Sequence, residues 1–285
     1  IKKIITSLSN ILKKPIIKKT KENDWKSFAK SILTTDTFPK ASYVISKIGN
    51  KKVKIIGVSK GSGMIAPNMA TMLGYIFTDA DLLPTTLNRL LTKVCEKTFN
   101  SITVDSDTST SDMVCFFSTR KVKCNIRNYS DKKLEKFKED LEQVALDLAK
   151  KIVFDGEGAS KLVEIKVTGG KSYKTSKKIA LSIANSPLVK TAIAGEDANW
   201  GRIIMAIGKT NETIEQDKIS LSFGNIMVIR AGEIVKGYKE NRLAKYLKEK
   251  ELQINIDLGM GSDVSKVWTC DLTKEYISIN ADYRS

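Results

Sequence analysis

Periodic apolar residues predict several amphipathic helices. Residues 84–99 begin with Pro84, which suits the first helical position, and they place leucines and a valine on one face. Residues 131–151 repeat apolar side chains at alternating spacings of three and four, which also indicates a helix. A shorter helix is expected at 23–33 and another at 238–250.

Short runs rich in β-branched residues predict strands between these helices. The runs 41–48 and 52–58 are joined through Gly49-Asn50, which suits the primed turn of a hairpin. Further strands are expected at 162–167, 219–223, 226–229 and 252–258, and residues 101–119 hold two strand-like pieces around a polar loop. Because strands and helices mix without strict βαβ alternation, the pattern favours an α+β fold over a doubly wound sheet.

Composition narrows the class of protein. With 285 residues, 41% of them hydrophobic, the chain is able to bury a substantial core. It has no run of about 18 apolar residues, so we expect no membrane span and a soluble protein. Four cysteines without CxxC spacing and a complete lack of histidine predict reduced thiols, a cytoplasmic location and no metal site.

The net charge of +16 raises the question of nucleic acid, but its distribution argues against that partner. The excess comes from 41 lysines against 7 arginines, spread along the chain among 32 acidic residues. Sequence-specific readers of nucleic acid favour arginine in a concentrated patch. A lysine-rich solvated surface is therefore the preferred interpretation.

The lack of histidine also removes the commonest general base, so an enzyme would need a carboxylate, a lysine or an amino terminus instead. Taken singly, segments rich in glycine, asparagine, aspartate or hydroxyl groups are more typical of turns than of sites. Six such segments stand out: ILTTDTFPK (32–40), KGSGMIAPNMATML (60–73), DSDTSTSD (105–112), FDGEGASK (154–161), GEDANWGR (195–202) and INADYRS (279–285).

Residues 60–73 closely resemble the self-cleavage segment of the ornithine acetyltransferase family, also called glutamate N-acetyltransferase. In that family the protein itself cuts between Ala and Thr of the ATML motif, here Ala70 and Thr71. The other five segments match family motifs in the family's order, so the chain is identified as a member over essentially its whole length. The resemblance implies a layered α/β/β/α sandwich with a smaller C-terminal α/β subdomain.

The resemblance also implies how the chain is divided. Residues 1–70 would form the end of an α fragment and residues 71–285 the β fragment, with a catalytic domain at about 71–185 and a subdomain at about 186–285. Family members assemble as α2β2. The family's Thr-Gly oxyanion pair precedes the TTDT segment and has no match in residues 1–33, so we expect a chain that starts downstream of it or an impaired variant.

The expected chemistry centres on Thr71. A threonine hydroxyl needs an adjacent base, and cleavage before Thr71 would free an α-amino group with a pKa of about 7.7–8.0. The resemblance implies transfer of acetyl from N-acetylornithine to glutamate through acetyl-Thr71, with no cofactor. Some members also accept acetyl-CoA, and the sequence leaves open whether this chain does.

The family's substrate contacts carry over to five positions besides Thr71: Thr34, Lys60, Glu157, Asn280 and Ser285. Lys60 is expected to hold a substrate carboxylate and to lower the pKa of the Thr71 amine, and Glu157 to pair with the ammonium groups of ornithine. Each also has a plain structural interpretation, as a solvated turn lysine, a loop residue or a helix cap.

Two other functions remain open from the sequence. An N-terminal-nucleophile aminopeptidase or amidase of related fold would use the same Thr71 chemistry but release its product to water. A basic nucleic-acid-binding or scaffold protein would remain uncut and would be retained on DNA at low salt.

Overall fold

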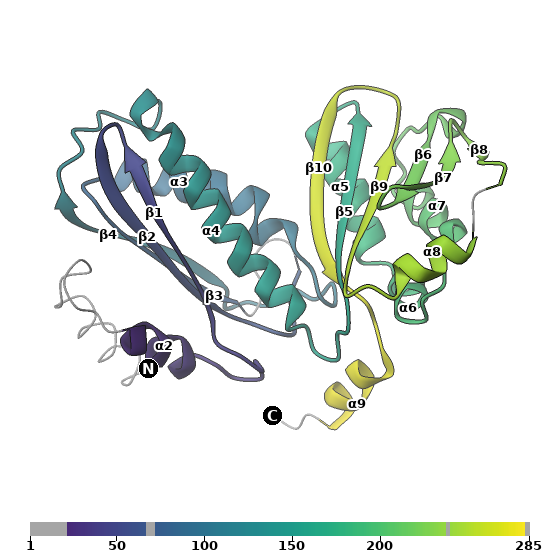
Figure 1. The fold of residues 1–285 in the computed structure, drawn as a ribbon, viewed down its shortest axis with the longest axis horizontal. Helices are drawn as coiled ribbons and strands as arrows, with labels where there is room; N and C mark the ends of the chain where they lie inside the picture. The colour runs from purple at the N-terminus through teal and green to yellow at the C-terminus, as the bar shows by residue number, and fades with distance from the viewer. Residues whose placement is uncertain (1–21, 67–71, 238–239, 283–285) are drawn as a thin grey trace. The chain divides into compact units, whose positions relative to one another are not determined.

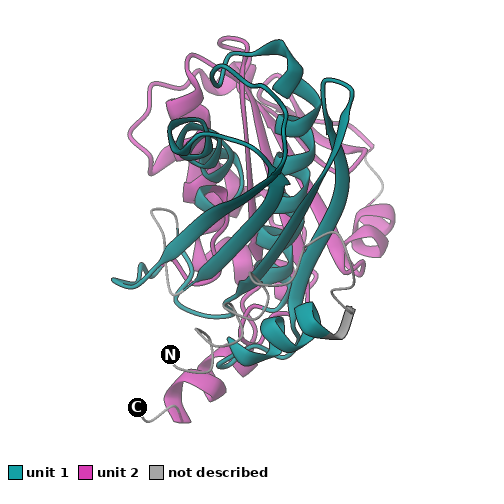
Figure 2. Cartoon of the chain, turned by 90° about the vertical axis from the view of Figure 1, so that its left-hand side faces the viewer, with its two compact units in different colours: residues 1–100, 107–155 teal, residues 101–106, 156–285 magenta. Residues whose placement is uncertain are grey.

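The computed structural model describes residues 22–66, 72–237 and 240–282. The chain divides into two compact units, coloured separately in Figure 2. Unit 1 comprises residues 1–100 and 107–155, and unit 2 comprises residues 101–106 and 156–285. Each unit contains its own sheet and its own helices (Figure 1).

Unit 1 is built on a four-stranded sheet in the order β1-β2-β3-β4. Its strands are β1 (Lys40–Ile48), β2 (Lys51–Lys60), β3 (Leu73–Ala80) and β4 (Met113–Val122). The first three are antiparallel neighbours, whereas β3 and β4 are parallel. In the hairpin of β1 and β2, Ile48 pairs with Lys51, and Gly49 has φ +57°, as a primed turn requires at its first central position.

Helices cover both faces of this sheet. Alternate residues of β2 point to opposite faces, so this strand contacts a helix on each side. Gly57 faces α4 (Glu135–Phe154) so closely that an added Cβ would lie 2.5 Å from a methyl group of Leu148. Its neighbours Ile56 and Val58 pack instead with Phe28 of α2 (Glu22–Ser31). The helix α3 (Pro84–Lys97) contacts α4 and β4.

Unit 2 is built on a six-stranded sheet in the order β10-β5-β9-β6-β7-β8. These strands are β5 (Leu162–Gly170), β6 (Ser220–Phe223), β7 (Ile226–Arg230), β8 (Glu233–Ile234), β9 (Glu251–Asp257) and β10 (Asp263–Cys270). The helices are α5 (Tyr173–Ala184), α6 (Pro187–Ala194), α7 (Trp200–Gly208), α8 (Glu240–Leu247) and α9 (Lys274–Asp282). The core lies between the sheet and helices α5 to α8.

The α+β class is confirmed, as are all four predicted helices, the hairpin and the four strands expected after residue 160. The prediction of a strand in the first part of residues 101–119 was wrong, because Ile102 there makes only an isolated bridge to Trp268. The pattern did not reveal helices α5, α6, α7 and α9 or strands β3, β8 and β10. No helix in the described ranges is long and apolar enough to cross a membrane.

The α2 side of the sheet yields a prediction about stability. Phe28 is fully buried against Tyr75 and Phe77, so Phe28→Ala should lower the free energy of unfolding by about 3–5 kcal/mol. The measurement is denaturant unfolding followed by tryptophan fluorescence. Tyr43→Ala is the control, because that side chain is 53% exposed and should cost at most about 1 kcal/mol. Equal losses in the two variants would contradict this account of the packing.

Candidate active site

Two of the sequence-predicted site residues meet in unit 1. Lys60 is the last residue of β2, and Thr34 lies in the loop between α2 and β1. The residue Lys60 is 7% exposed, and its ammonium group donates a hydrogen bond of 3.1 Å to the Thr34 hydroxyl. Lys60 is therefore a buried, oriented cation, and the interpretation as a solvated turn lysine is wrong.

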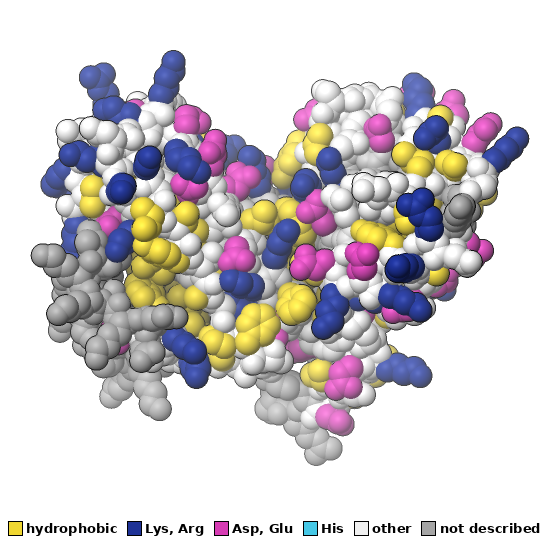
Figure 3. Space-filling view, viewed as in Figure 1, with side chains coloured by type: hydrophobic (Ala, Val, Ile, Leu, Met, Phe, Trp, Pro, Cys, Tyr) yellow, Lys and Arg dark blue, Asp and Glu magenta, His cyan; other side chains and the backbone are white. Residues whose placement is uncertain are grey.

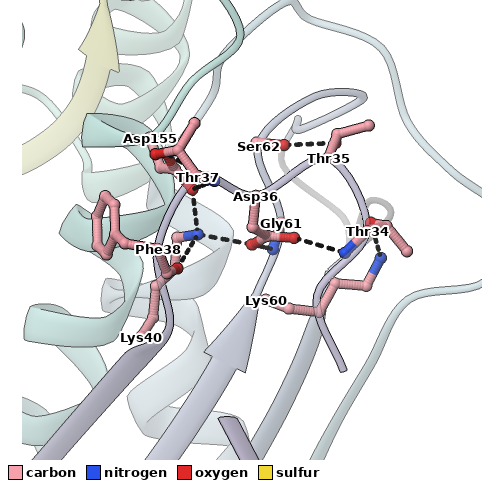
Figure 4. A network of polar contacts seen from close by, with 10 residues as sticks. All are labelled: Thr34, Thr35, Asp36, Thr37, Phe38, Lys40, Lys60, Gly61, Ser62 and Asp155. Carbon is pink, nitrogen blue, oxygen red and sulfur yellow. Dashed lines mark hydrogen bonds and ion pairs between the residues drawn. The ribbon is translucent and has the colours of Figure 1, made fainter. Parts of the chain in front are cut away.

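The backbone after Lys60 is fixed by a carboxylate in the TTDT segment. Gly61 has φ +146°, a conformation open to glycine and rare for other residues. Its N–H donates to Asp36 Oδ1 at 2.6 Å, and the N–H of Thr34 donates to Asp36 Oδ2 at 3.2 Å. Asp36 thus ties the segment around Thr34 to the end of β2 (Figure 4).

A buried lysine completes this network. Lys40, the first residue of β1, is fully buried and lies 2.6 Å from Asp36 and 2.5 Å from Asp155 at the end of α4. Asp155 also accepts hydrogen bonds from the N–H of Thr37, at 3.0 Å, and from the Thr37 hydroxyl (Figure 4). A buried cation with two buried carboxylates and several donors is the arrangement in which such charges are tolerated.

The charge state of Asp36 follows from these contacts. Burial alone would raise its pKa, but hydrogen bonds from Gly61, Lys40 and Thr34 and the charge of Lys40 outweigh burial. The pKa of Asp36 is therefore lowered from its ordinary value, and the group is a carboxylate throughout the physiological range. The network keeps a fixed pattern of charge beside Thr34 and Lys60.

Unit 2 brings together the second pair of predicted residues. Asn280 lies in α9, and its side-chain amide donates to Glu157 Oε2 at 3.0 Å and to the carbonyl of Tyr276 at 3.0 Å. Gly158 has φ +68°, and a Cβ there would lie 2.4 Å from the backbone nitrogen of Tyr276. The glycine-containing turn therefore packs directly against α9 and sets the position of Glu157.

The remaining predicted residues, Ala70, Thr71 and Ser285, lie outside the described residues. The structure describes the chain again from Met72, which is anchored on both sides. The Met72 N–H donates to Asp112 Oδ1 at 2.7 Å, and its carbonyl accepts from the N–H of Met113 at 3.1 Å. The residue that follows Thr71 is thus held beside the end of the 105–112 segment.

Asp36 and three further polar residues of the site region were not singled out from the sequence. Lys40, Asp112 and Asp155 stood inside segments marked as unusual, and the signal that could have found them is a charged residue next to an apolar strand or helix end. The 195–202 segment has a structural role instead. Its Arg202 donates to the carbonyl of Leu188 at 2.7 Å and joins α7 to α6.

Metal and nucleic-acid sites find no support in the described parts of the chain. No group of three or more histidine, cysteine, aspartate or glutamate side chains there could hold a metal ion. On the face drawn in Figure 3, lysine and arginine side chains are scattered and interleaved with acidic ones. That distribution differs from the concentrated basic patch typical of nucleic-acid binding.

Comparison with known proteins identifies the family of this chain. The model of the ArgJ family matches residues 1–285. The chain belongs to the ArgJ family. It is 53% identical over 263 residues to the arginine biosynthesis bifunctional protein ArgJ of Zymomonas mobilis, covering 92% of this chain and 64% of that protein. It is 50% identical over 268 residues to the protein of the same name from Brucella suis, covering 93% and 65%.

A solved ArgJ structure shares the fold. The crystal structure of the arginine biosynthesis bifunctional protein ArgJ from Bacillus halodurans is 38% identical, with a TM-score of 0.69. The match covers 75% of this chain and 100% of that chain. The family recognised from the six motifs is thereby confirmed, and the chain spans about 64–65% of the length of the first ArgJ relatives it matches.

The Asp36 network predicts a pH-dependent contribution to stability. Because the folded pKa of Asp36 lies below its unfolded value, its stabilisation is complete above about pH 4 and is lost as the pH falls through the folded pKa. Asp36→Asn should therefore lower the free energy of unfolding by about 1.5–3 kcal/mol at pH 7 and by less near pH 3. Urea unfolding of both proteins at the two pH values measures this difference.

Asp147→Asn is the matched control, because the Asp147 ion pair with Lys151 is partly exposed. That variant should lose no more than about 1 kcal/mol at pH 7. A loss for Asp36→Asn that is the same at pH 3 and pH 7 would show that the charge of Asp36 is not what stabilises the site.

Proposed function

We propose that this chain carries the acetyl-transfer site of an ArgJ enzyme and moves acetyl from N-acetylornithine to glutamate through acetyl-Thr71, after self-cleavage between Ala70 and Thr71. The observation that carries the proposal is the part-buried contact of Lys60 with Thr34, at the end of β2 where Lys60 pairs with Leu73, the first residue of β3. Family membership supports it, since the relatives' names place them in arginine biosynthesis.

The solved ArgJ chain agrees in length with a fragment that begins at Thr71. A fragment that begins at Thr71 would hold 215 of the 285 residues, which is 75% of the chain. The Bacillus halodurans chain is covered completely by 75% of this one. A separate chain of that length is what cleavage before Thr71 would produce.

The proposed transfer has two balanced steps. The free amine of Thr71 takes the proton of its own hydroxyl, whose oxygen attacks the acetyl carbonyl of N-acetylornithine, and ornithine leaves with that proton. Glutamate then attacks acetyl-Thr71 through its amine, which gives N-acetylglutamate and restores the hydroxyl. Lys60 would hold a substrate carboxylate in this scheme and lower the pKa of the Thr71 amine, so that more of it is in the basic form at neutral pH.

We also propose substrate contacts for the pair in unit 2, as the family resemblance implies. Glu157 supplies a carboxylate for an ammonium group of ornithine, and the hydrogen bond from Asn280 orients it. We place Ser285 with them as a further contact at the chain end. Both acetyl steps run without a cofactor, and acetyl-CoA as a second donor stays open. We further propose a cytoplasmic α2β2 assembly of the two fragments.

The alternative is hydrolysis by the same Thr71 chemistry. Incubation with N-acetylornithine and glutamate separates the two, because transfer yields N-acetylglutamate whereas an amidase yields acetate. The buried Lys60 favours transfer over hydrolysis. N-acetylornithine and glutamate each carry a carboxylate, and the same cation could bind either one.

Substitution of Thr71 provides the main test. Thr71→Ala should leave the chain uncut and unable to transfer acetyl, whereas Thr71→Ser keeps the hydroxyl and should still be cut. Intact mass reports cleavage. Brief exposure of the cut wild type to N-acetylornithine without glutamate should add about 42 Da to the fragment that begins at Thr71, as a covalent acetyl intermediate requires. Acetyl transfer by Thr71→Ala, or an acetyl mass on another residue, would refute the mechanism.

Substitution of Lys60 tests its role. Lys60→Ala should raise the Michaelis constant for N-acetylornithine by about tenfold or more, because a charge-assisted contact contributes about 1.5–3 kcal/mol. It should also raise the pH at which activity appears, since the Thr71 amine would lose a neighbouring cation. Steady-state kinetics across pH 6–10 measure both changes. Lys178→Ala serves as the control, because Lys178 is exposed and pairs with Glu212 in unit 2; kinetics alike for both variants would remove Lys60 from the site.

A further inference from the structure

We infer that Asp271 and Thr273 are positioning residues for Glu157, and that through it they determine how well the site binds the free ammonium group of N-acetylornithine. Both residues lie between β10 and α9, where the chain leaves the sheet of unit 2. This inference rests on the proposed contact of Glu157 with that ammonium group. It adds what holds the Glu157 carboxylate in place.

Glu157 lies at the first central position of a tight turn. The N–H of Ala159 donates to the carbonyl of Gly156 at 2.8 Å and closes the turn. Gly158, the second central residue, has φ +68°, which glycine adopts without strain. The Glu157 carboxylate accepts a hydrogen bond from the exposed amide of Asn280. Because an exposed contact holds a side chain only weakly, the direction of this carboxylate depends mainly on the backbone of the turn.

Thr273 holds the backbone of this turn. Its hydroxyl donates to the carbonyl of Gly158 at 2.6 Å, and the N–H of Glu275 donates to the same hydroxyl at 3.2 Å. The hydroxyl therefore links the turn to the first residues of α9. Without it, the peptide group after Gly158 would lose its donor and could rotate, and the turn that directs Glu157 would rotate with it.

Asp271 holds the other end of the same loop. Its Oδ1 accepts the N–H of Ser160 at 2.8 Å and the N–H of Lys161 at 3.0 Å. Its Oδ2 accepts the hydroxyl of Ser160 at 2.5 Å. Asp271 is buried, and a buried carboxylate is stable only when donors surround it, so its position and that of the loop are fixed together. Asp271 and Thr273 thus hold the loop on both sides of Ala159.

This positioning matters for one of the two proposed substrates. N-acetylornithine keeps one free ammonium group, at the end of its side chain, whereas glutamate carries a carboxylate there. A charge-assisted hydrogen bond depends on the distance and direction between its two groups. A displaced Glu157 would therefore weaken the binding of N-acetylornithine and would not weaken that of glutamate. A general loss of stability would have no such preference.

The test is steady-state kinetics of Thr273→Val in the full chain, with each substrate varied in turn. Valine keeps the shape and removes the donor, so the Michaelis constant for N-acetylornithine should rise about three- to tenfold and that for glutamate should change less than about twofold. Thr273→Ser restores the hydroxyl and should restore the wild-type constant. Thr191→Val is the matched control, because that exposed hydroxyl donates to the carbonyl of Pro187 at 2.7 Å in α6.

A second variant tests the other positioning residue. Asp271→Ala removes all three contacts to the loop and should raise the same Michaelis constant about tenfold or more. Thermal unfolding reports whether this variant is folded. If it is not, Thr273→Val still tests the inference, because it removes a single hydroxyl from a half-buried side chain.

A Glu157→Gln background shows whether Thr273 acts through Glu157. Glu157→Gln alone should raise the Michaelis constant for N-acetylornithine, and added Thr273→Val should then change it little, because the effects of coupled residues do not add. Wild-type kinetics in Thr273→Val, the same rise in both backgrounds, or equal rises for both substrates would overturn the inference and leave the proposed function standing. Unchanged kinetics in Glu157→Gln would instead refute the proposed Glu157 contact, and the positioning roles with it.

Discussion

The candidate site depends on one buried charge, the ammonium of Lys40. A fully buried cation is stable only when carboxylates and further donors surround it, and here Asp36 and Asp155 supply the carboxylates. These two residues lie in different parts of unit 1, one before β1 and one at the end of α4. Through Asp36 the same charge fixes Gly61, and with it the end of β2 where Lys60 turns toward Thr34.

Two aspartates of unit 1 show how surroundings decide what a carboxyl group does. Asp36 receives two backbone donors and a lysine, and its pKa is lowered. Asp112 receives one backbone donor and keeps a buried oxygen without a partner among the described residues, and its pKa is raised. The first is therefore suited to hold structure through charge, and the second is the more easily protonated of the two.

The sequence predicted most elements whose apolar pattern is local, such as α3, α4 and the β1-β2 hairpin. The strand β3 was not predicted, because it is buried on both faces and its apolar and polar residues do not alternate. Nearby glycines and a proline indicated a loop instead. The helices α5 and α6 had readable signals in their capping serines, Ser172 and Ser186, each of which accepts a backbone N–H three residues on.

The site was predictable only where its residues belong to local sequence motifs. Motif resemblance named Lys60 and Thr34 as site residues, and the structure shows a hydrogen bond between them. The partnership of Lys40 with Asp155 spans 115 residues and depends on where α4 ends in space, which no local pattern specifies. The contact of Met72 with Asp112 is likewise a product of parallel pairing between β3 and β4.

The pairing of β2 with β3 has a consequence for what a cut between them would leave behind. The two strands pair from Ile55 to Lys60, on either side of the Ala70-Thr71 bond. If that bond were broken, these ladder hydrogen bonds would run between two polypeptides, and so would the ion pair of Lys40 with Asp155. Separation of the pieces would require splitting a continuous sheet and exposing a buried charge, so the two pieces of a cut chain would stay together.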